Sequence, residues 1–110
     1  MYQTHYNKAL TLMKSGKNEE AIIEFDQAIK LAPERVGAYF NKGMALMELD
    51  KNEKAIKVFD QAIKINSDYA PAYYGISKAL DKLGKHEKSM QYYDKALELN
   101  PSLLKKPFIY

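Results

Sequence analysis

The chain has 110 residues, of which 46% are hydrophobic and 28% charged, as expected for one ordinary globular domain. Its net charge of +3 is too small to indicate a nucleic-acid or membrane partner. The absence of cysteine excludes a disulfide framework, a thiol nucleophile and a cysteine metal site.

The sequence shows no pattern typical of a signal peptide or a membrane-spanning helix. The N-terminal stretch MYQTHYNKAL lacks the basic segment and apolar run of a signal peptide. No apolar run approaches the roughly 18 residues that a membrane-spanning helix needs. We therefore expect a cytoplasmic protein.

A repeated stretch organises the chain. Residues 21–33 read AIIEFDQAIKLAP and residues 55–67 read AIKVFDQAIKINS, so 8 of 13 letters agree at a distance of 34 residues. A third copy, SMQYYDKALELNP, covers residues 89–101, and the segments before the three copies also align. We expect a single domain of three units and a short tail, with approximate boundaries 2–35, 36–69, 70–103 and 104–110.

Each unit is predicted to form two helices. Apolar residues between 52 and 65 recur at spacings of three and four, which is one face of an α-helix. Gly16, Asp50 and Gly84 mark the turn inside each unit, and prolines mark the boundaries between units. In chain order, the helices are expected at residues 2–14, 18–31, 35–48, 52–65, 69–82 and 86–99.

Seven columns of similar residues run through the three units. Two aromatic columns hold His5, Tyr39, Tyr73 and Phe25, Phe59, Tyr93. Three columns of small residues hold Ala9, Gly43, Ser77; Ala21, Ala55, Ser89; and Ala28, Ala62, Ala96. One column of large residues holds Leu12, Leu46, Leu80, and the proline column holds Pro33, Ser67, Pro101. This pattern resembles the tetratricopeptide repeat, whose helix–turn–helix unit has a period of about 34 residues. The resemblance covers residues 2–103, and His5 and Ser67 depart from the family pattern. It implies an all-α fold, a right-handed α-solenoid of six helices in which stacked units share one core.

Catalytic chemistry is not indicated by the sequence. His5 and His86 lie in different units without metal-ligand spacing, and we interpret both as structural or surface residues. The glycines are isolated, so no phosphate-binding loop is present. Lysines are spread along the helices with acidic residues between them and do not predict a nucleic-acid patch. We expect neither enzyme activity nor a cofactor nor a metal.

The family resemblance instead implies a binding surface. In this family the first helices of successive units line a concave groove that receives peptides or extended segments. The family's groove positions fall here on Tyr6, Asn7, Leu10, Met13, Phe40, Asn41, Met44, Met47, Tyr74 and Lys78. Methionine suits adaptable apolar recognition, and the two asparagines could orient a peptide backbone. The alternative is that the methionines and Leu10 are core residues.

Chaperone adaptors of this fold grip a C-terminal carboxylate with lysine, asparagine and arginine. The corresponding positions here hold Tyr6, Leu10, Asn41, Pro71 and Gly75, and only Asn41 matches. The sequence therefore argues against that role.

The last helix has an apolar side formed by Met90, Tyr93 and Leu97. Three interpretations remain open: the chain is part of a longer repeat protein, it self-associates, or its apolar tail covers this side or enters a neighbour's groove. The candidate self-association residues are Tyr93, Leu97, Phe108, Ile109 and Tyr110. Two functions are compatible with these observations. The first is a non-enzymatic protein-interaction module or scaffold, whose partner is a peptide or helix with apolar or aromatic side chains. The second is a structural assembly unit.

Overall fold

The computed structural model describes residues 1–103, and residues 104–110 lie outside the described part. Within residues 1–103 the chain forms six α-helices and one short 3₁₀ turn. They are α1 (Tyr2–Lys14), α2 (Asn18–Leu31), α3 (Val36–Glu48), α4 (Asn52–Ile65), α5 (Ala70–Lys82), α6 (His86–Leu99) and η1 (Pro101–Leu103). The predicted all-α solenoid is confirmed. The tail residues Phe108, Ile109 and Tyr110, predicted to take part in self-association, fall outside the described residues.

The predicted helix ends agree with the structure except at two N-termini. The third and fifth helices begin one residue later than expected, at Val36 and Ala70. Arg35 and Tyr69 are instead the N-cap residues, and neither has helical backbone angles.

The turn inside each unit has the same hydrogen-bond pattern. After α1, the N–H of Gly16 donates to the carbonyl of Met13 at 2.9 Å, and the N–H of Lys17 donates to that of Leu12 at 2.8 Å. This pair of bonds is the Schellman motif, which places the residue after the helix end in the left-handed region. Gly16 and Gly84 have φ values of 78° and 80° there.

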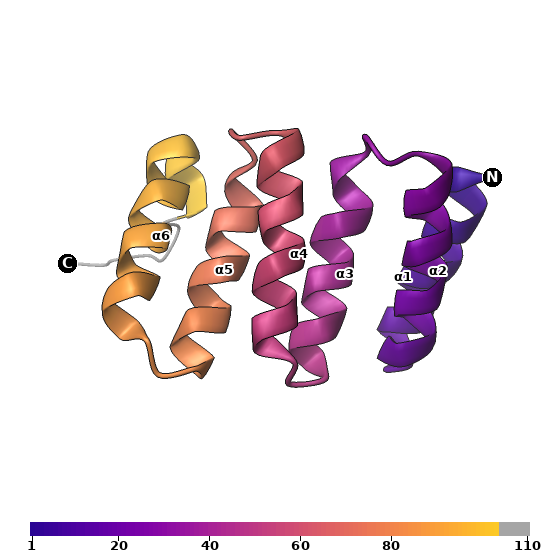
Figure 1. Cartoon of the computed structure of the whole chain (residues 1–110), viewed down its shortest axis with the longest axis horizontal. Coiled ribbons are helices and arrows are strands. Elements are labelled where there is room, and N and C mark those ends of the chain that lie inside the picture. Colours follow the sequence, from indigo (N-terminus) through magenta and orange to yellow (C-terminus); the bar gives the residue numbers. More distant parts are fainter. Residues whose placement is uncertain (104–110) are drawn as a thin grey trace.

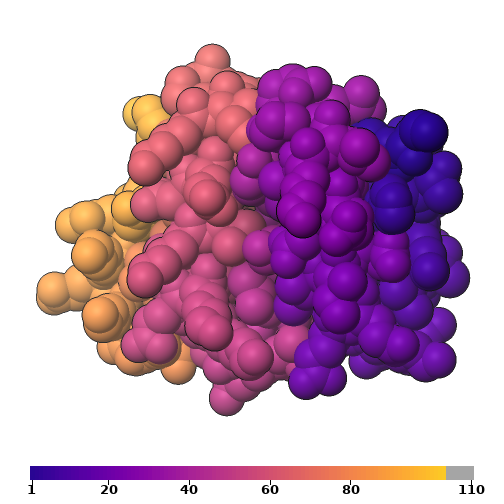
Figure 2. Space-filling view, turned by 45° about the vertical axis from the view of Figure 1, so that its right-hand side comes forward, coloured from indigo at the N-terminus to yellow at the C-terminus, as the bar shows by residue number. Residues whose placement is uncertain are grey.

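The helices stand side by side, and α3 to α6 follow one another along the molecule in chain order, whereas α1 and α2 overlap at the N-terminal end of the view (Figure 1). Figure 2 shows the same progression on the surface, from the indigo N-terminal end to the orange and yellow C-terminal end. The first helices touch one another, since α3 contacts both α1 and α5. Among the described helices, no Cα atom of α2 lies within 8 Å of one of α4, and the same holds for α4 and α6. The array therefore bends toward α1, α3 and α5, which form its inner layer.

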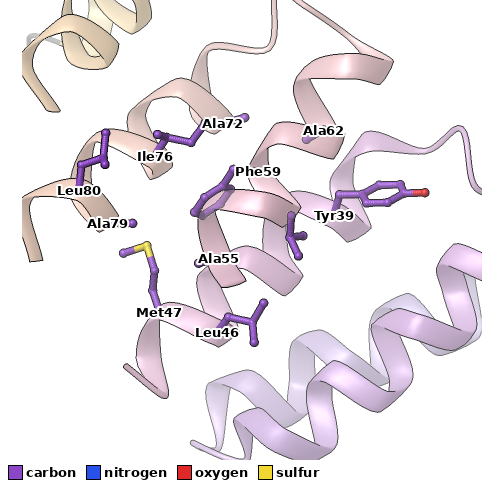
Figure 3. Packing of buried hydrophobic residues seen from close by; sticks show 11 residues of the cluster. Tyr39, Leu46, Met47, Ala55, Phe59, Ala62, Ala72, Ile76, Ala79 and Leu80 are labelled. Carbon is purple, nitrogen blue, oxygen red and sulfur yellow. The ribbon is translucent and has the colours of Figure 1, made fainter. Parts of the chain in front are cut away.

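Two phenylalanines of the repeated stretch anchor the core. Phe25 and Phe59 are both 0% exposed, each at the centre of a buried cluster. Figure 3 shows the Phe59 ring between α4 and the side chains Ala72 and Ile76 of α5. The aromatic column that contains Phe25 and Phe59 thus supplies side chains that join neighbouring helices.

None of the described helices is long and apolar enough to cross a membrane.

Candidate functional site

The predicted groove residues come from the inner layer of helices. Residues 6–13 lie on α1, residues 40–47 on α3, and Tyr74 and Lys78 on α5. One aromatic side chain from each helix is at least partly accessible: Tyr6 and Phe40 are half-buried, and Tyr74 is 36% exposed. Side chains of this kind offer large contact area with little loss of conformational freedom on binding.

A hydrogen bond joins the first two inner helices. Asn41 Nδ2 donates to Tyr6 Oη at 2.9 Å and to the carbonyl of Gly37 at 3.0 Å. The Tyr6 ring also stacks on Tyr2, with ring centroids 5.5 Å apart. The amide hydrogens of Asn41 are thus directed to groups of the protein, which leaves its Oδ1 to accept a hydrogen bond from a ligand.

Phe40 lies at the junction of two aromatic neighbours. Its ring centroid is 5.8 Å from that of Phe59 and 5.8 Å from that of Tyr69, the latter in an edge-on arrangement. Burial raises the pKa of the Tyr69 phenol, so this phenol stays protonated at neutral pH. Phe40 is therefore held in one orientation by rings on two sides while part of it remains accessible.

The sulfur-containing and aliphatic candidates divide between core and surface. Met47 is 5% exposed and points from α3 toward Ala79 and Leu80 of α5 (Figure 3), so the core alternative applies to it. Leu10, Met13 and Met44 are half-buried against the core clusters. The spacing of residues along the helix could not distinguish core from groove residues, because on α3 the two kinds of position lie only one helical turn apart.

Toward the C-terminal end the inner face becomes more polar. Lys78 Nζ lies 5.2 Å from the centroid of the Tyr74 ring, and the Tyr74 and Tyr93 rings are 5.9 Å apart. These residues line a cleft of about 290 Å³ between α5 and α6, which exposed Met90 borders. Leu97, the remaining described candidate for self-association, is half-buried on α6.

The repeat position that holds Asn41 in the second unit differs in its residue type or its contacts in the other two units. Asn7 is exposed, and its Oδ1 accepts a hydrogen bond from Gln3 Nε2 at 2.9 Å. Gly75 occupies the equivalent position in the third unit, yet it is buried directly against Phe59. The absence of a side chain at Gly75 was the available signal that this position is used for close packing.

The histidines and their carboxylate partners form isolated pairs. His5 Nδ1 lies 2.7 Å from Glu24 Oε1, and His86 Nδ1 lies 3.0 Å from Asp81 Oδ1. These hydrogen bonds to histidine lower the pKa of each carboxyl, so both stay ionised at neutral pH. No group of three potential metal-ligating side chains occurs among residues 1–103.

Two family models, both described as tetratricopeptide repeat, match residues 6–71 and residues 70–103. No curated protein sequence matches the chain.

Solved structures show the same fold at low sequence identity. The first TPR domain of human RPAP3 is 28% identical, with a TM-score of 0.88 over 92% of this chain and 80% of that one. The second TPR of Spaghetti (RPAP3), bound to the HSP90 peptide SRMEEVD, is 26% identical, with a TM-score of 0.85 over 90% of this chain and 92% of that one. MamA is 29% identical, with a TM-score of 0.85 over 92% of this chain. The alignment spans 59% of the MamA chain.

Proposed function

The chain belongs to the tetratricopeptide repeat family, and from this premise we propose that it is a non-enzymatic interaction module that binds a peptide or helix along α1, α3 and α5. The observation that carries the proposal is the series of accessible aromatic rings Tyr6, Phe40 and Tyr74, one from each inner helix. Apolar side chains of an amphipathic segment would be buried against this series.

Structural relatives support the ligand class. The two TPR domains of Spaghetti (RPAP3) were solved with a bound HSP90 peptide, and each is more than 25% identical to this chain. We propose a different ligand, because four of the five positions compared with carboxylate-gripping adaptors hold Tyr6, Leu10, Pro71 and Gly75. None of these side chains carries a charge that would hold a carboxylate, so we propose apolar or aromatic anchors.

The experiment selects peptides from a random-peptide phage library on the purified chain and measures their Kd by calorimetry. Phe40→Ala and Tyr74→Ala should each weaken binding by about 2 kcal/mol, because central aromatic anchors contribute most of the binding energy. Ile23→Ala is the matched control, since Ile23 is 59% exposed on α2, outside the inner layer. Circular dichroism confirms that each variant is folded. Peptides that respond to Ile23→Ala and ignore Phe40→Ala would place binding elsewhere.

A second candidate function is assembly through α6. Met90 is 64% exposed, and it lines the cleft between α5 and α6 together with the half-buried Tyr93. An exposed apolar side chain beside aromatic rings suits a contact with another copy or with further repeats. η1 follows α6 directly and contacts it.

A further inference from the structure

A second cleft lies on the opposite side of the array, where α2 and α4 diverge. Its volume is about 460 Å³, within the range of about 300–1,000 Å³ typical of ligand sites. It is lined by Glu19 and Ile22 of α2, Lys42 and Leu46 of α3, and Leu49, Lys51, Lys54, Lys57 and Val58 in and before α4. None of the predicted groove residues is among them.

The cleft has two causes, the bend of the array and the small size of the side chain at position 58. Because the backbones of α2 and α4 are not close to each other, side chains of α3 and α4 form the floor between them. Val58 lies on this floor, and the residue 34 positions later is Tyr92, whose ring packs against the core. A tyrosine ring at Val58 would occupy space that valine leaves open.

The floor of the cleft is apolar and its rim is basic. Leu46 and Val58 are buried, while Ile22 and Leu49 are half-buried. Four lysines face a single acidic residue, Glu19.

Three of these lysines are available to a ligand. Lys42 Nζ is already 2.7 Å from Asp26 Oδ1. Lys51, Lys54 and Lys57 make no ion pair within residues 1–103. They follow one another at intervals of three residues, over about 9 Å of helix axis at 1.5 Å per residue.

We infer that this cleft is a second binding site for an acidic peptide that inserts an aliphatic side chain. The apolar floor takes the aliphatic group, and carboxylates on either side of it meet the lysines in series. A single small anion would not span all three lysines, which extend over about 9 Å of helix axis, and it would leave the apolar floor unused. A nucleic-acid strand would meet the lysines but would leave the aliphatic floor unused, since no aromatic side chain lines the cleft for base stacking.

The test uses a fluorescein-labelled octapeptide with two central leucines flanked by glutamates, followed by fluorescence polarisation on the full chain. The chain should bind it, and replacing its leucines by alanine should weaken binding about tenfold through loss of apolar burial. The double variant Lys51→Glu/Lys54→Glu should also weaken it about tenfold, because attraction becomes repulsion at two positions. Binding should weaken as salt rises.

Matched variants separate this site from general electrostatics and from the inner groove. Lys85→Glu/Lys88→Glu makes the same charge change at the equivalent positions of the third unit and should leave the Kd unchanged. Phe40→Ala should also leave it unchanged, so this proposal can fail while the groove proposal stands. Val58→Tyr should abolish binding without changing any charge.

Three results would overturn the inference. The first is that the intact chain does not bind the peptide. The second is that both lysine double variants lose the same amount of peptide affinity. The third is that a single-stranded oligonucleotide displaces the peptide at a lower concentration than unlabelled peptide does. Because the lysine variants change only exposed side chains, they stay informative even where Val58→Tyr fails to fold.

Discussion

At the scale of single residues, Asp50 shows how the repeat tolerates a departure from glycine. Its φ is 63°, in the same left-handed region as Gly16 and Gly84. Asp and Asn enter this region more readily than other side chains. Asn52 Nδ2 donates to Asp50 Oδ1 at 3.2 Å, which further supports the turn.

Asp50→Ala should therefore lower the free energy of unfolding by about 1 kcal/mol relative to Asp50→Gly, since alanine has no compensation for the left-handed strain. Urea unfolding followed by circular dichroism measures the difference. Gly84→Ala, at the equivalent turn, should show a similar loss relative to the parent chain. Equal stability of Asp50→Ala and Asp50→Gly would mean that the backbone relaxes out of this conformation.

At the scale of helices, two glycines allow α3 and α5 to close around one ring of α4. A Cβ atom added at Gly43 would lie 2.5 Å from Phe59 Cε1, and one added at Gly75 would lie 2.7 Å from Phe59 Cζ. These distances are too short for carbon atoms, so the contact depends on the missing side chains. The fully buried Phe59 is thus held between two helices that approach it through glycine.

Gly75→Ala should test this arrangement through a double-mutant cycle. Overpacking against Phe59 costs about 1–3 kcal/mol, whereas alanine in a helix interior gains about 1 kcal/mol over glycine. Gly75→Ala should therefore destabilise the parent chain. In a Phe59→Leu background the clash is relieved, and the same change should become stabilising. Chemical denaturation of the four chains measures the coupling, and strictly additive effects would contradict the contact.

At the scale of the whole molecule, the bend of the array separates two surfaces. The inner layer carries Tyr6, Phe40 and Tyr74, and the diverging outer helices leave the basic cleft beside Val58. The C-terminal helix adds a third surface around Met90. The basic cleft shares no lining residue with the other two surfaces, whereas the groove and the α6 surface meet at the cleft lined by Tyr74 and Met90.

The assembly proposal predicts a molecular mass that rises with concentration in sedimentation equilibrium. Met90→Glu should return the chain to the monomer, because a carboxylate would be desolvated in an α6 contact. Ile23→Glu is the matched control on α2, where a similarly exposed aliphatic residue lies outside the proposed contact. A monomer at all concentrations in the parent chain would exclude assembly through α6.

Most of the fold could be predicted from the sequence because its period repeats the same local signals. The 34-residue spacing located every helix to within one residue, and glycine or aspartate marked each turn. The candidate site was less predictable. Core and groove residues share one helical face, so the burial of Met47 and the packing role of Gly75 emerged only with the neighbouring helix in place.

By itself, the sequence determined the all-α repeat architecture and the absence of cysteine chemistry, because both depend on residue type and spacing along the chain. Only the tertiary structure decided which lysines lie close together. Lys42 of α3 and the lysines at the start of α4 line one cleft with an apolar floor, although Lys42 is not their neighbour along the chain. The bend between successive units brings these lysines together. This bend depends on how the helices pack across the core around Phe59, which no local sequence pattern shows.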